Sequence, residues 1–197
     1  MGNGGKKSKA KRASNAVPRK MTERRLHNIA QFYVERYATT AANLRRVLMR
    51  RVDRACKHHG DDRARMIPWV DAAVEKLVKL RVVDDARYAL DRARSLRRLG
   101  RSPQKIRAHL MAKGVPAPLV RDALAATERT EAGGDAAHEA ALAYARRRRL
   151  GPFRVFTGTA DEKRKQAAKD LAAMGRAGFS YDVAKRVMAL TPDQIAA

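Results

Sequence analysis

The chain has 197 residues, of which 45% are apolar and only 5% aromatic, a composition that favours a core of small aliphatic side chains on helices. Its 44 Lys and Arg against 20 Asp and Glu give a net charge of +24, which excludes a neutral scaffold and favours a polyanionic partner. A single cysteine excludes an internal disulfide, and no apolar run reaches the length of a membrane span. We therefore expect a cytoplasmic protein without membrane association.

Residues 1–21 are predicted to form a disordered basic tail. The first twenty residues contain seven Lys and Arg, no acid and almost no large apolar side chain, so they cannot bury enough surface to offset the entropy lost on ordering. Two interpretations of the tail stay open. It is either a mobile arm that lies along phosphates or a leader that increases solubility.

Residues 22–83 are predicted to form a first helical repeat. Thr22 is the expected N-cap of one helix, and the Thr39–Thr40 break precedes a second helix whose apolar stripe includes Leu44 and Leu48. A third helix starts at Pro68, next to Trp69, which we interpret as a core anchor. The outward face of the second helix is cationic and supplies the first candidate binding residues: Arg45, Arg46, Arg50 and Arg51.

Residues 84–130 are predicted to form a second repeat. Asp84 caps its first helix, which ends at Gly100. Ser102 caps the next helix, and Gly114 supplies a left-handed exit before a third helix that begins near Pro118. The first two helices are expected to expose a second cationic face: Arg94, Arg97, Arg98, Arg101, Lys105 and Arg107.

Residues 135–191 are predicted to form a third repeat. Asp135 caps a helix that runs into a tract of four cations, some of which should lie near the packed face: Arg146, Arg147, Arg148 and Arg149. The sequence GPFRVFTGT at 151–159 indicates a loop. Asp161 is expected to open the next helix, and Ser180 to cap the last. The predicted buried face of the helix after Asp161 contains Ala167, Ala168, Leu171 and Met174.

The three ranges share one layout, which predicts an all-α fold of tandem three-helix units. Leu44 and Leu48 precede Ile106 and Leu110 by sixty-two residues each. Apolar positions likewise recur five and ten residues after two glycines, at Leu119 and Leu124 after Gly114 and at Val183 and Met188 after Gly178. Because one such unit buries little surface, we expect the units to stack into an elongated, curved molecule.

Three motifs in this order resemble the RecX family of bacterial regulators of the RecA recombinase. They are VDDARYA at 83–89, LMAKGV at 110–115 with Leu119 and Val120 beyond it, and GFSYDV at 178–183. The resemblance covers about residues 24 to 190. The basic tail, the arginine tract and the loop at 151–159 are not features that the family requires.

The resemblance implies a protein that binds in the groove of the RecA filament on single-stranded DNA and inhibits strand exchange, ATP hydrolysis and coprotease activity. It would act in homologous recombination, DNA repair and the SOS response. The implied partners are the RecA filament and single-stranded DNA, with double-stranded DNA as a further candidate, and the implied state is a monomer. The fourteen basic residues named above are the candidates for these contacts.

Two other classes of function are alternatives. A sequence-nonspecific DNA- or RNA-binding protein would act through charge alone, and it would affect a recombinase only by competing for DNA. An enzyme is not expected, because the sequence has no nucleophile–base pattern and no phosphate-binding glycine loop, and Asp84–Asp85 is explained by helix capping. No cofactor is expected. The histidines and cysteine at 56–59 lack the spacing of a metal site.

Overall fold

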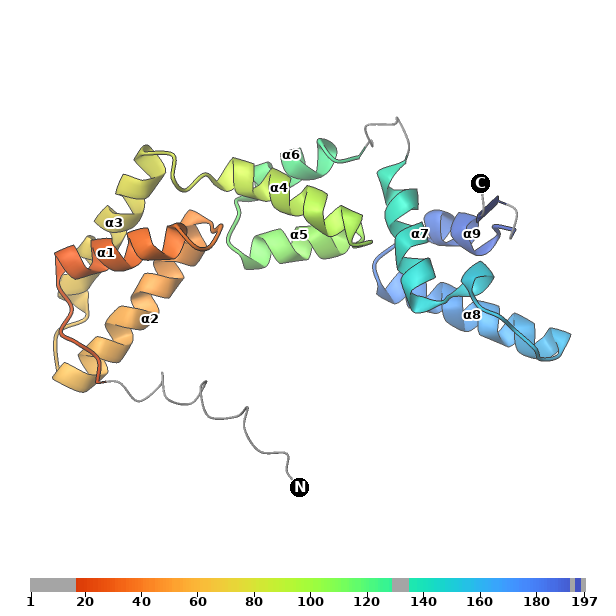
Figure 1. Ribbon diagram of the computed structural model, residues 1–197, viewed down its shortest axis with the longest axis horizontal. Coiled ribbons are helices and arrows are strands. Elements are labelled where there is room, and N and C mark those ends of the chain that lie inside the picture. Colours follow the sequence, from red (N-terminus) through yellow and green to blue (C-terminus); the bar gives the residue numbers. More distant parts are fainter. Residues whose placement is uncertain (1–16, 129–134, 192–193, 196–197) are drawn as a thin grey trace, which may run out of the picture. The chain divides into compact units, whose positions relative to one another are not determined.

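The computed structural model describes residues 17–128, 135–191 and 194–195, and within these ranges it contains helices and no β-strand. The chain divides into two compact units, one ending at Val83 and the other beginning at Asp84. In Figure 1 the first unit runs from red to yellow and the second from green to blue. The first unit holds one set of three helices and the second holds two. The predicted all-α fold of three-helix units is confirmed.

Most of the predicted basic tail lies outside the described residues, which begin at 17. The last residues of the predicted tail, from 18 to 21, are packed against the first unit. Met21 is buried, the Lys20 Nζ lies 3.8 Å from a carboxylate oxygen of Asp61, and the Pro18 carbonyl oxygen lies 2.6 Å from Nε2 of His59. The packed chain therefore starts a few residues earlier than predicted, because Met21 adds apolar surface to the core.

The first unit contains three helices and a short 3-10 turn: α1 (Glu23–Val34), α2 (Ala41–His59), η2 (Ala64–Met66) and α3 (Ile67–Lys79). The side chains of Thr22 and Thr40 accept hydrogen bonds from the N–H groups of Arg25 and Asn43, so the predicted cap at Thr22 is present and the break before the second helix supplies a further cap. Gly60 ends α2 in the left-handed conformation, at φ 71°.

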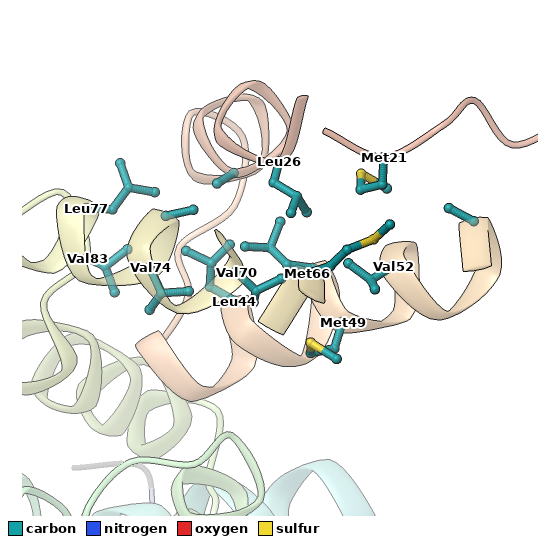
Figure 2. Packing of buried hydrophobic residues seen from close by; sticks show 14 residues of the cluster. Met21, Leu26, Leu44, Met49, Val52, Met66, Val70, Val74, Leu77 and Val83 are labelled. Carbon is teal, nitrogen blue, oxygen red and sulfur yellow. The ribbon is translucent and has the colours of Figure 1, made fainter. Parts of the chain in front are cut away.

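One hydrophobic cluster holds these three helices together. Figure 2 shows Leu26 of α1, Leu44 and Val52 of α2 and Val70 of α3 converging on a common interior, and none of the four has measurable exposure. Trp69 is half-buried and packs against the same cluster, as expected of a core anchor. Because the apolar stripe of α2 turns inward, its arginines are left on the outer face.

The second unit begins with its own three-helix set: α4 (Asp85–Arg98), α5 (Pro103–Ala112) and α6 (Ala117–Ala125). Asp84 caps α4 and Ser102 caps α5, both as predicted. Ile106 and Leu110 of α5 are fully buried against Ala89 and Ala93 of α4 and the apolar face of α6.

The last set consists of three helices and a second 3-10 turn: α7 (Ala136–Arg148), η3 (Gly151–Phe153), α8 (Ala160–Arg176) and α9 (Tyr181–Met188). Its core surrounds Met174 and includes Phe179 and Val187. In each of the three sets the third helix packs against both the first and the second, which is the contact pattern of a repeat.

The structure corrects the prediction for α8. Thr159, and not Asp161, caps this helix, in a capping box with Glu162. Ala167 and Ala168 are exposed rather than buried. The buried positions of α8 are Met174 and an acid, Asp170. The apolar pattern missed Asp170 because a carboxylate is buried only where hydrogen-bond donors surround it.

The two sets of the second unit meet where α4 and the start of α5 face α7 and the end of α8. A β-carbon at Gly100 would lie 3.0 Å from backbone atoms of α7, so the backbones are in close contact. The Ser102 hydroxyl donates a 2.6 Å hydrogen bond to the carbonyl of Ala177, seventy-five residues away. Arg147 donates a 2.6 Å bond to the carbonyl of Leu99. Three contacts thus fix this joint.

Candidate nucleic-acid interface

The first candidate surface is the outer face of α2. Arg45, Arg46, Arg50 and Arg51 are all exposed there. Arg45 is engaged in a 2.6 Å ion pair with Asp71, and both side chains are about half exposed. A pair this open to water contributes little stability, so an incoming phosphate could replace the carboxylate at small cost. Arg50 and Arg51 form no ion pair with a described acid.

The second candidate surface lies on α4 and α5 in the second unit. Five of the six predicted residues are exposed: Arg94, Arg98, Arg101, Lys105 and Arg107. Within the described ranges none of the five is in an ion pair. Their charge is therefore available to a partner, because no acid of the described chain neutralises it.

Arg97 departs from the prediction, because its side chain is buried rather than exposed. The residue is 8% exposed, and its Nε donates a 3.2 Å hydrogen bond to the hydroxyl of Thr127, just beyond α6. Burial lowers the pKa of Arg97, although the nearby negative charges of Glu128 and Asp135 act to raise it. Helical spacing placed Arg97 on the boundary of the apolar stripe, and the turn after α6 covers it. Arg97 therefore belongs to the interior of the second unit.

The arginine tract is wholly exposed, contrary to the expectation that part of it approaches the packed face. Helix α7 ends inside the tract, because Arg149 adopts the left-handed conformation at φ 53° and turns the chain away. Arg146 lies over the ring of Phe153, with 5.5 Å between the guanidinium carbon and the ring centroid. Arg147 lies 5.8 Å from the ring centroid of Tyr144. The arginine side chains therefore do not have to extend from a packed face to reach water.

The structure brings three predicted residues together with one that the sequence did not indicate. Arg101, Lys105 and Arg148 line a cavity of about 270 Å³ between the two sets of the second unit, and Arg176, the last residue of α8, lines it too. Arg176 was missed because it is one of many cations in α8, and only the contact between Ser102 and Ala177, the residue after α8, places it here.

Other kinds of site find no support in the described residues. No group of three or more His, Cys, Asp or Glu side chains in that part of the chain could hold a metal ion. Cys56 is half-buried with its Sγ 3.8 Å from the sulfur of Met66, and burial raises the pKa of its thiol. Of the helices that the structure describes, none is long and apolar enough to cross a bilayer.

The fold and these faces define a class of protein: a helical protein of three-helix repeats that presents to solvent many cations not paired with acids in the described part of the chain. The family model described as "RecX, second three-helix domain" matches residues 84–124, which span α4 to α6. Among known proteins, the regulatory protein RecX of Myxococcus xanthus is 46% identical over 180 residues, covering 89% of this chain and 90% of the relative.

A second relative and a solved structure are also RecX proteins. The regulatory protein RecX of Agrobacterium fabrum is 30% identical over 167 residues, covering 85% of this chain and 83% of that protein. A crystal structure of RecX from Lactobacillus salivarius matches with a TM-score of 0.60 at 19% identity, over 88% of this chain and 96% of that one. The chain belongs to the RecX family of regulatory proteins.

Proposed function

We propose that this protein binds RecA nucleoprotein filaments, and DNA through its basic faces, and thereby inhibits recombinase, ATPase and coprotease activity. Membership of the RecX family carries the proposal, because the two curated relatives are regulatory proteins and match most of the chain. We further propose that it acts in the cytoplasm, as a monomer and without catalysis of its own.

The charge distribution supports this proposal. A recombinase filament presents phosphate and acidic protein surface side by side, and both attract arginine. The candidate faces offer exposed guanidinium groups that are free of ion pairs with described acids, including Arg50, Arg51, Arg94 and Arg98. Such groups release condensed counterions on binding, which makes the association strong at low salt.

The direct test adds the protein to RecA filaments preformed on single-stranded DNA and follows ATP hydrolysis. We expect inhibition at far less than one molecule per recombinase, since a filament regulator acts on many subunits at once. A protein that merely competes for DNA would need enough copies to cover the strand. Inhibition that appears only at such coverage would contradict the proposed regulator.

A charge-reversal pair tests the α2 face in the same assay. Arg50→Glu with Arg51→Glu should weaken inhibition by about 10- to 100-fold, because each lost charge-assisted contact contributes about 1.5 to 3 kcal/mol before solvent screening. The matched control, Lys163→Glu with Lys165→Glu, changes the net charge equally at exposed positions of α8. Equal losses in both variants would show that net charge alone matters.

The second candidate function, sequence-nonspecific binding of DNA or RNA, is favoured by the net charge of +24. If six to ten cations meet phosphates, affinity for free DNA should fall by about 10³ to 10⁵ between 50 and 200 mM salt. A nonspecific binder would show this salt dependence on any polyanion, heparin included, and leave filaments unaffected at low ratio. A salt dependence near zero would remove phosphate contacts from both functions.

A further inference from the structure

The cavity at the joint of the second unit is cationic on both of its walls. It is lined by Gly100, Arg101, Ser102, Lys105, Tyr144, Arg148, Ala173, Arg176 and Ala177. One wall comes from the α4–α5 connection and the start of α5, and the other comes from α7 and the end of α8. Four of the nine lining residues carry a positive charge and none carries a negative one.

No acid among the described residues compensates the four cations of the cavity. Within the described ranges, Arg101, Lys105, Arg148 and Arg176 take part in no ion pair. All four residues are exposed, so their charges are available to an anion that enters the cavity.

The walls are held at a fixed separation. Gly100 meets the backbone of α7 with no room for a side chain, and the Ser102 hydroxyl is bonded to the carbonyl of Ala177. Beside this hydrogen bond, a β-carbon on Gly178 would lie 2.7 Å from the Ser102 Oγ. The cations therefore cannot move apart by opening of the joint unless these contacts break. The site is formed before a ligand arrives.

The start of α5 adds a second positive element. This ten-residue helix begins at Pro103, and its first turn carries Ser102 and Lys105 into the cavity wall. Pro103 has no N–H and the N–H of Lys105 is already bonded to the Ser102 hydroxyl, so the helix contributes mainly the partial positive charge of its dipole, which favours oxyanions. Helix terminus and cationic side chains thus act on the same space.

We propose that this cavity binds one backbone phosphate of single-stranded DNA and so joins the second and third repeats through the ligand. A phosphodiester is favoured over a carboxylate because cations from three separate helical segments converge, and a phosphate group offers oxygens in more directions than a planar carboxylate does. The volume of about 270 Å³ is many times that of a water molecule and accommodates such a group. The inference rests on the proposed function only for the identity of the strand.

The test is a double-mutant cycle on the affinity for an oligothymidine. Arg176→Gln and Arg148→Gln each remove one cation from the wall formed by α7 and the end of α8, and each should weaken binding about tenfold. Because both contact the same phosphate, the double variant should lose much less than the product of the two single effects. Arg176→Gln should also reduce the magnitude of the salt slope by about 0.7, the value for one phosphate of a single strand.

Two controls make the cycle specific. Lys163→Gln neutralises an exposed cation thirteen residues before Arg176 on the same helix, and it should leave the affinity and the salt slope nearly unchanged. Arg50→Gln combined with Arg176→Gln should give independent, multiplicative losses, because Arg50 lies in the other unit. Multiplicative losses for Arg148→Gln with Arg176→Gln would overturn the shared site.

Two further measurements separate the possible anions. The same cycle measured on a polyglutamate peptide should show no coupling, and coupling of equal size there would assign the cavity to acidic protein instead. Millimolar inorganic phosphate should change the melting temperature of the wild type and of Arg176→Gln equally. A rise confined to the wild type would indicate a site for free phosphate and overturn the assignment to DNA.

The RecA assay distinguishes failure of this inference from failure of the proposed function. Coupling on oligothymidine without inhibition of filaments would leave the cavity standing and remove the regulator. Inhibition of filaments by the wild type together with multiplicative losses in the cycle would support the regulator and rule out the phosphate site in the cavity.

Discussion

At the residue scale, Asp170 holds the chain after α7 against α8. Its side chain is 4% exposed and lies 3.1 Å from Nη2 of Arg154. The same carboxylate accepts hydrogen bonds from the N–H of Gly151, at 2.8 Å, and from Nε2 of Gln166, at 2.7 Å. A buried carboxylate with three donors stabilises the turn η3, whereas the donors would be left unpaired without it.

Replacing this carboxylate should destabilise the second unit. Asp170→Ala is expected to lower its free energy of unfolding by about 3 kcal/mol, near the low end for breaking a buried pair because Arg154 remains partly open to water. Urea denaturation followed by circular dichroism measures the change. Asp161→Ala, at a side chain that is 80% exposed, should change stability by less than about 0.5 kcal/mol. Equal effects of the two variants would refute the role of Asp170.

The residues whose burial the sequence did not predict lie where distant segments of the chain meet. Arg97 looked like its exposed neighbours Arg94 and Arg98, and its burial depends on Thr127, thirty residues away. Asp170 likewise reaches Gly151 and Arg154 across a turn and a helix. Such contacts leave no local periodic signal, so a single sequence could not indicate them.

At the element scale, helix starts followed from local chemistry and were predicted well. Thr22, Asp84, Ser102 and Ser180, all predicted as caps, accept side-chain hydrogen bonds from the N–H of the third residue beyond, and Thr40, predicted only as part of a break, does the same. The failure at α8 has a local cause as well. Asp161 and Glu162 both suit a first helical turn, and only the reciprocal bonds of the capping box select Thr159 as the cap.

The cap of α7 gives a prediction at this scale. Asp135 accepts bonds from the N–H groups of Ala137 and His138 and pairs with Arg186 of α9 at 2.9 Å. Asp135→Ala should lower the stability of the second unit by about 1 to 2 kcal/mol, as expected for loss of an N-cap. The shift of the urea midpoint by circular dichroism measures it. An unchanged midpoint would show that the cap contributes nothing.

The same cap should respond to pH. Burial acts to raise the pKa of Asp135, but the bonds from Arg186, His138 and Ala137 together lower it below its ordinary value. A pKa that is lower in the folded state means that the stabilisation is complete above about pH 4 and is lost as the pH falls through the folded pKa. Asp135→Asn keeps a capping side chain without titrating, so its stability should vary less over that range than the wild type's.

At the scale of the whole molecule, the two units have separate cores. The cluster around Leu44 draws only on residues up to Val83, while the other two clusters lie beyond it. The chain has a single tryptophan, Trp69, and it packs against the first cluster. Its fluorescence is therefore a selective probe of the first unit.

We expect the two units to unfold independently. Asp170→Ala should shift the part of the circular dichroism transition that comes from the second unit, and leave the urea midpoint of Trp69 fluorescence within error of the wild type, because no residue of the first core is altered. Parallel recording of both signals on one sample makes the comparison. Fluorescence that follows the dichroism would show one cooperative molecule.

The candidate interface was less accessible to prediction than the repeat itself. Apolar spacing and glycines revealed three similar sets, because each set is built from contacts within about forty to sixty residues. The cavity is made by Lys105, Arg148 and Arg176, which come from two repeats and are far apart in sequence. The packing of the second repeat against the third determines which cations lie together. The sequence pattern does not predict how the two repeats pack.

The two glycines at the joint limit how the chain can vary. Gly100 has φ 67° and Gly178 has φ 86°, and at each a β-carbon would meet an atom of the opposing repeat at 3.0 Å or less. Any side chain there would be strained in conformation, and it would press on the backbone of α7 at Gly100 and displace the side chains of Ser102 and Gln104 at Gly178. In a saturation library these two positions should tolerate almost no substitution, while the arginines around them tolerate many for folding and few for binding. A selection for folding would thus identify the two glycines of the joint, and a selection for binding would identify the arginines around them.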